Sequence, residues 1–125
     1  MLLDFRSEKP IYIQLAESIE DDILKGVFEE EGQIPSTTEM SIALKINPAT
    51  SAKGVGLLVD EGIVYKKRGL GMFVSSGARK LIEGKRRKAF YNDFLLALLN
   101  EAGKLNIGRD EVIEMIGRSK TDERD

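Results

Sequence analysis

Two helix-start signals lie so close together in this sequence that the helix between them must be short. Ser36-Thr37-Thr38-Glu39 has the order of a capping box, in which the serine and glutamate side chains each accept a backbone hydrogen bond. Asn47-Pro48 is a second start, because asparagine is a strong N-cap and proline fits the first helical turn. The pair predicts a helix at 37–44, a tight turn at 45–47 and a helix at 48–61, which together form a helix-turn-helix.

The spacing of apolar residues predicts the remaining elements. Ile11, Leu15 and Ile19 recur at helical spacing and predict a helix at 10–25. Residues 26–35 are expected to be a connector. Two apolar runs around a glycine-bearing turn predict a β-hairpin, and a second helical pattern follows it. The elements predicted after the helix-turn-helix are strands at 63–67 and 72–75, a long helix at 78–102 and a short helix at 111–119.

The order of these elements defines the expected architecture. Three helices followed by a hairpin form a winged helix-turn-helix, so the expected fold class is mainly α with a small β-hairpin (α+β). We expect two domains: a winged helix-turn-helix DNA-binding domain at 1–76 and a short two-helix dimerisation region at 77–125.

Charge is concentrated in one segment, although the whole chain has a formal net charge of only −2. Residues 65–88 carry nine Lys or Arg and one Glu, a net charge of +8, whereas residues 1–64 carry −7 and residues 89–125 carry −3. A concentrated basic segment between acidic flanks is typical of an anion-binding face, and a solvated charged linker is the alternative.

The absence of cysteine and histidine excludes several classes of binding site and catalytic site. The chain has no cysteine and no histidine, which excludes disulfides, thiolate zinc sites and catalytic Cys-His or Ser-His-Asp groups. With no phosphate-binding loop either, we expect no enzyme activity, no cofactor and no metal, and we interpret Glu29-Glu30-Glu31 as a solvated loop. No apolar run is long enough to span a membrane and no signal sequence opens the chain, so we expect a cytoplasmic protein with no membrane partner.

Four motifs occur in order along the first half of the chain, at spacings shared with a known family. They are Pro10-Ile11-Tyr12-Ile13-Gln14-Leu15, Ile34-Pro35-Ser36 with Glu39-Met40, Asn47-Pro48-Ala49-Thr50, and Gly62-Ile63-Val64 with Arg68-Gly69-Leu70-Gly71-Met72-Phe73-Val74. In these motifs the sequence resembles the GntR family of bacterial transcription regulators, and its short C-terminal part is similar to that of the YtrA-type subgroup. The resemblance implies a homodimer that binds a double-stranded DNA operator and acts as a repressor.

The chain departs from the family pattern in three places. Thr38 stands where the family usually has an arginine that contacts DNA, so one charge-assisted contact is missing. Glu30 and Glu31 stand where the family usually has Pro-Gly. Gly54-Val55 stands where it usually has Ala-Tyr, and another glycine follows. Because interior glycines weaken a helix, we expect a soft recognition helix that DNA orders.

The predicted recognition helix and wing supply the candidate DNA contacts. Asparagine can read adenine, the methyl groups of Ala49 and Thr50 can touch thymine, and Lys53 can pair with guanine or a phosphate. Arg68, at the glycine-bearing tip, suits a narrow minor groove or the adjacent backbone. The expected DNA-binding set is Ser36, Thr37, Thr38, Asn47, Pro48, Ala49, Thr50, Ser51, Lys53, Lys67, Arg68, Gly69, Leu70 and Gly71.

The long helix predicted at 78–102 carries an apolar row that a winged domain is too small to cover. We expect a second copy of the chain to cover it, since two-fold dimers are the commonest oligomers, and a monomer core is the alternative. The basic run at 85–88 is interpreted either as a phosphate contact or as a solvated helix face. The expected dimer-interface residues are Phe90, Phe94, Leu95, Leu98 and Leu99.

Two questions stay open from the sequence alone. A winged helix can also serve as a protein-binding or RNA-binding module without specific DNA recognition, and this is the alternative function. An unknown small-molecule effector is a further open partner. The C-terminal region is too small for an enclosed pocket of the usual roughly 300 Å³ or more, which leaves the dimer seam as a site.

Overall fold

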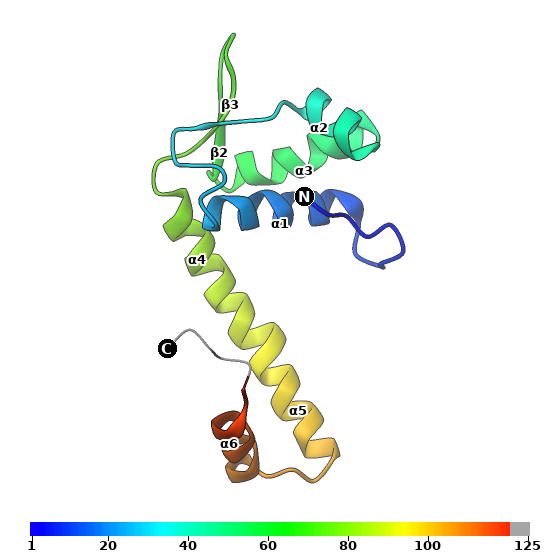
Figure 1. The fold of residues 1–125 in the computed structure, drawn as a ribbon, viewed down its shortest axis with the longest axis vertical. Helices are drawn as coiled ribbons and strands as arrows, with labels where there is room; N and C mark the ends of the chain where they lie inside the picture. The colour runs from blue at the N-terminus through cyan, green and yellow to red at the C-terminus, as the bar shows by residue number, and fades with distance from the viewer. Residues whose placement is uncertain (121–125) are drawn as a thin grey trace. The chain divides into compact units, whose positions relative to one another are not determined.

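The computed structural model describes residues 1–120 and confirms a mainly helical fold with a small antiparallel sheet (Figure 1). The first elements are α1 (Ile11–Leu24), β1 (Gln33–Ile34), α2 (Thr37–Leu44) and α3 (Pro48–Asp60). The hairpin follows as β2 (Val64–Lys67) and β3 (Gly71–Val74). The remaining helices are α4 (Ala78–Ala89), the π-helix η1 (Phe90–Leu95), α5 (Leu96–Lys104) and α6 (Arg109–Arg118).

Packing divides the chain into two compact units, Met1–Gly84 and Lys85–Asp125. The first unit holds the winged helix-turn-helix and extends past residue 76, the expected end of the first domain. It extends this far because Ala78 and Ile82, at the start of α4, are buried in its core. The last residues of the expected C-terminal region, 121–125, lie outside the described part of the chain.

The core of the first unit forms where α1 packs against α3. Leu15, Ile19 and Ile23 of α1 are buried there, as their helical spacing predicts, and they meet Val55 and Leu58 of α3. Burying one large aliphatic side chain stabilises a fold by about 1.5–3 kcal/mol. This apolar face therefore fixes α3 to the unit.

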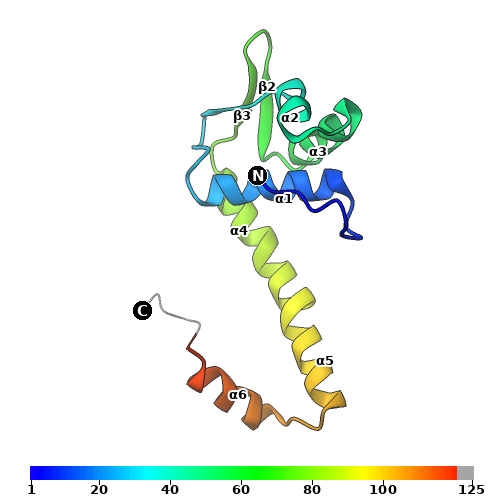
Figure 2. The same ribbon diagram turned by 45° about the vertical axis from the view of Figure 1, so that its right-hand side comes forward.

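The sheet has one more strand than the sequence predicts. Its order is β1-β3-β2, with both neighbouring pairs antiparallel. The extra strand β1 lies in the expected connector, and its residues Gln33 and Ile34 pair with Phe73 and Met72 of β3. Figure 2 shows the β2–β3 hairpin extending beyond α2 and α3, which gives the first unit its wing.

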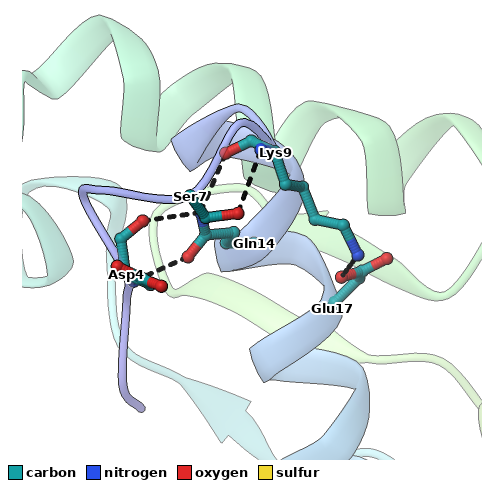
Figure 3. A network of polar contacts seen from close by, with 5 residues as sticks. All are labelled: Asp4, Ser7, Lys9, Gln14 and Glu17. Atoms are coloured by element: carbon teal, nitrogen blue, oxygen red, sulfur yellow. Dashed lines mark hydrogen bonds and ion pairs between the residues drawn. The ribbon is translucent and has the colours of Figure 1, made fainter.

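A glutamine organises the segment that precedes α1 (Figure 3). The side-chain oxygen of Gln14 accepts a hydrogen bond from the Asp4 backbone at 2.7 Å, and its Nε2 donates to the carbonyls of Asp4 and Lys9 at 2.9 and 2.8 Å. The Lys9 ammonium forms an ion pair with Glu17 at 2.9 Å. The motif from Pro10 to Leu15 therefore includes an anchor for the chain ahead of the helix.

The second unit consists of the end of α4, η1, α5 and α6. Helical structure continues from α4 through α5, as the single long helix predicted, but the stretch η1 is π-helical. The short last helix begins at Arg109 with Gly108 as its N-cap, slightly before the predicted start. An open apolar groove of about 290 Å³ lies between α5 and α6. No helix within residues 1–120 is both long enough and apolar enough to cross a membrane.

Candidate nucleic-acid interface

Local hydrogen bonds fix the start of α2 as its sequence predicts. The Ser36 hydroxyl accepts a hydrogen bond from the Glu39 backbone at 3.0 Å, and the Glu39 carboxylate accepts one from the Ser36 backbone at 2.9 Å. These bonds are the reciprocal pair of a capping box and confirm that prediction. They hold Thr37 and Thr38 in the first turn, with Thr38 exposed.

The turn between α2 and α3 is tight because one residue adopts a left-handed conformation. Lys45 ends α2 with φ of 57°, and the next N–H, that of Ile46, donates to the Ser41 carbonyl at 3.0 Å. The Asn47 side chain then caps α3 by accepting a hydrogen bond from the Ala49 backbone at 2.7 Å. The turn between the two helices thus spans the three residues predicted.

The first turns of α3 present most, but not all, of the expected contact residues to solvent. Asn47, Pro48, Ala49 and Lys53 are exposed, and Thr50 is half-buried. Ser51 has 0% exposure, and its hydroxyl donates to the Thr37 carbonyl at 2.9 Å. A side chain with no exposed surface cannot touch DNA, so the structure gives Ser51 a different role, tying α3 to the start of α2.

The Lys53 ammonium lies over an aromatic ring of α1. Its Nζ is 4.1 Å from the centre of the Tyr12 ring, within the range of a cation–π contact. The close approach of the two helices allows this contact, because Gly54 lies directly against the Tyr12 backbone. Tyr12 therefore orients the lysine expected to contact DNA.

The wing tip is a glycine-containing turn that carries the expected cation. Leu70 N donates to the Lys67 carbonyl at 2.9 Å, which closes the turn over Arg68 and Gly69. Gly69 has φ of 78°, a conformation that favours glycine. Arg68, Gly69 and Leu70 are exposed, whereas the Lys67 ammonium lies 4.3 Å from the centre of the Phe73 ring.

The acidic loop before β1 bonds to the protein, which the solvated-loop interpretation missed. The Glu30 carboxylate accepts hydrogen bonds from the Gly77 and Arg79 backbones at 2.8 and 3.1 Å, at the start of α4. The Glu31 carboxylate accepts hydrogen bonds from the Tyr65 hydroxyl and from the backbone and hydroxyl of Ser76. These carboxylates are exposed, but they join the loop to the base of the wing and to the start of α4. The sequence signal that could have indicated this role is the presence of Glu30 and Glu31 where the family usually has Pro-Gly.

These bonds lower the pKa of each carboxyl below its ordinary value of 4.5. For Glu30 the main cause is hydrogen bonding from the Gly77 and Arg79 backbones, and for Glu31 it is the Tyr65 hydroxyl. A carboxyl whose pKa is lowered by folding stabilises the fold above its unfolded pKa. This stabilisation is lost as the pH falls through the folded value.

We therefore expect the melting temperature to fall as the pH is lowered through 4.5 and below it. Glu31→Gln should show a shallower fall than the wild type, since one of the responsible groups is gone. Glu29→Gln is the matched control, because the Glu29 carboxylate has no bonding partner among the described residues. Melting curves across this pH range test the assignment, and equal slopes for Glu31→Gln and the wild type would contradict it.

The sequence and the fold are similar to those of known transcriptional regulators. No family model matches the chain. The chain is 36% identical over 84 residues to the HTH-type transcriptional repressor YtrA of Bacillus subtilis (strain 168), covering 66% of this chain and 65% of YtrA. A solved structure assigned to the GntR family of transcriptional regulators, from Bacteroides thetaiotaomicron, is 37% identical with a TM-score of 0.72 and covers 85% of this chain and 92% of that one. A structure of AraR(DBD) in complex with operator ORX1 is 30% identical with a TM-score of 0.54, covering 60% of this chain and 93% of that one.

These similarities and the winged helix-turn-helix define a class of protein, the helix-turn-helix transcriptional regulators. The chain belongs to the GntR family of these regulators and is of the YtrA type. The match spans just under two thirds of the length of YtrA itself.

Proposed function

We propose that this chain is a sequence-specific DNA-binding repressor that acts as a homodimer on a palindromic operator. The N-terminal end of α3 enters the major groove, and the wing lies on the adjacent backbone or minor groove. Residues 1–76 bind DNA, residues 77–125 form the dimerisation region, and the protein acts in the cytoplasm.

One observation carries the proposal: the start of α3 and the wing tip are both exposed in a compact unit similar to an operator-bound domain. The start of a helix directs free N–H groups outward and favours the negative charge of phosphates. Arg68 at the tip and Lys53 on α3 add cations. The proposed contacts are therefore the expected set without the Ser51 side chain.

The homodimer is supported by the exposed apolar surface of the second unit. Phe90 and Phe94 are 63% and 66% exposed, and their ring centres lie 5.9 Å apart. Leu95 and Leu98 are also exposed, while Leu99 is half-buried. Apolar patches of this kind on soluble domains mark interfaces. A two-fold dimer presents two recognition helices to half-sites about one DNA turn apart, or a multiple of it.

Two other functions predict different results in DNA-binding experiments. A winged helix that binds protein or RNA predicts no preference among DNA duplexes. An unidentified small-molecule effector, if one acts on the chain, has room in the open groove between α5 and α6. DNA binding measured with the purified protein, without any added small molecule, distinguishes both alternatives from a repressor that binds its operator unaided.

Lys53→Ala and Arg68→Ala should each weaken DNA binding by about tenfold without loss of fold, since each removes one base or phosphate contact. Fluorescence anisotropy over a salt series measures both the affinity and the number of phosphates contacted. Lys25→Ala is the matched control, because it removes the same charge at the opposite end of α1 from Tyr12. Unchanged affinity for both variants would contradict the assigned face.

A further inference from the structure

Side chains from the segment before α2 reach the wing at its tip and its base. In β1, Gln33 Nε2 donates to the backbone carbonyl of Leu70, in the wing turn, at 2.8 Å. Glu31 accepts hydrogen bonds from the Tyr65 hydroxyl on β2 and from Ser76, which follows β3. One short stretch of chain thus bonds to the turn and to both strand ends of the hairpin.

The backbone is shaped around these contacts. Glu31 has φ of 65°, a left-handed conformation that residues other than glycine rarely adopt. Three hydrogen bonds to its carboxylate, and one from its backbone N–H to the Val74 carbonyl at 2.8 Å, hold it there. Gly71 has φ of 123°, and a Cβ at this position would lie 2.6 Å from Gln33 Nε2. Glycine at 71 therefore leaves the space that Gln33 needs to reach the wing turn.

A hairpin of two four-residue strands is short, and isolated two-stranded hairpins are marginally stable in water. The strand β1, of two residues, and the backbone bonds just before it support only one side of this hairpin. The side-chain bonds of Glu31 and Gln33 extend this support to the base and to the tip. The Gln33 bond meets the wing at Leu70, and the Glu31 bonds include one to β2, the strand that ends at Lys67. Leu70 and Lys67, and Arg68 between them, are in the proposed DNA-contact set.

We propose that Glu31 and Gln33 are positioning residues that hold the wing in its DNA-binding orientation; we call this pair the wing brace. The inference rests on the proposed function, since it assigns these residues a part in the same interface. The brace acts through Lys67 and Arg68. Fixing the wing before binding lowers the cost of ordering it on DNA.

A double-mutant cycle tests the brace on the duplex that the wild-type protein binds. Gln33→Ala is first compared with the wild type. The same substitution is then made in the double variant Lys67→Ala/Arg68→Ala, whose wing lacks both cations and which we call the wing-disabled background. The brace predicts that Gln33→Ala lowers DNA affinity roughly threefold to tenfold in the wild-type background and less than about twofold in the wing-disabled one. The losses differ because Gln33 acts through the wing cations. Equal losses in the two backgrounds would overturn it.

Glu31→Gln and Glu29→Gln form a matched pair, since each removes one negative charge from the same loop. If the loss of negative charge were their only effect, both substitutions would strengthen DNA binding equally. The brace predicts weaker binding by Glu31→Gln than by Glu29→Gln in the wild-type background, and equal binding in the wing-disabled one. A role in stability alone lowers the melting temperature of Glu31→Gln but leaves the two affinities equal, and this result would overturn the proposal.

A readout without DNA separates the brace from the proposed function. Backbone amide order parameters measured by NMR on free Gln33→Ala should fall at Arg68–Gly71 and stay unchanged in α1. A wild-type protein that binds every duplex equally would count against the proposed function alone. Unchanged order parameters at the wing tip in Gln33→Ala would overturn the brace.

Discussion

Replacing Phe94 by glutamate is expected to leave the chain monomeric and to lower its affinity for a palindromic duplex by roughly a hundredfold. Phe94 is the most exposed side chain of the aromatic pair in the second unit. A carboxylate there, once buried by a second copy, loses its hydration without gaining a partner. A monomer also loses the effective concentration that couples two half-sites.

Light scattering gives the mass directly, as either 13.9 kDa or about twice this value. Asn92→Glu is the matched control, because it adds the same charge to η1 two positions away, on another face of the helix. It should remain a dimer. A dimer of unchanged mass for Phe94→Glu would refute the proposed interface.

Gly54→Ala should destabilise the fold by about 1–3 kcal/mol, although alanine is the better helix former. Gly54 lies in α3 against α1, and an added Cβ would be 2.8 Å from the Tyr12 carbonyl oxygen and 3.1 Å from a methyl group of Leu15. A backbone oxygen that close cannot move without shifting α1. The separation of the two helices should therefore increase, and the Lys53–Tyr12 contact should be lost with it.

The neighbouring glycine makes an internal control. A Cβ at Gly56 meets no atom within 4 Å, so Gly56→Ala should stabilise the chain by about 0.5–1 kcal/mol through helix propensity. Urea unfolding of both variants measures the two free-energy changes. If both substitutions changed the free energy of unfolding in the same direction, the assigned close packing at Gly54 would be contradicted. Both glycines would then act alike, by lowering the stability of α3.

The helix-turn-helix could be predicted nearly to the residue because its signals are local. The capping box at Ser36 and the N-cap at Asn47 each act through hydrogen bonds to their own helix. The strand β1 could not be predicted in this way. Two residues are too few to show a period of two, and Gln33 becomes a strand residue only by pairing with Phe73 across the sheet.

The candidate site was predictable as a region but not in each side chain. Ser51 lies in the first turns of α3, where spacing alone favours a DNA contact, yet it is buried because α2 covers it. Tyr12 and Glu31 were missed because their partners, Lys53 and Tyr65, are distant in sequence. Only tertiary structure brings these pairs together. The π-helical geometry of η1 likewise has no signal in the apolar row that predicted one continuous helix.

Fluorescence anisotropy of the purified protein on DNA shows whether this chain is a sequence-specific DNA-binding regulator. The duplex is the DNA upstream of the chain's own gene, the control is a scrambled duplex of equal length, and both are measured over a salt series. We expect tighter binding to the native duplex than to the scrambled one. We also expect log K to fall against log salt with a slope of about 0.9 per phosphate contacted. No binding to either duplex at low salt would contradict a DNA-binding function and favour a protein-binding winged helix.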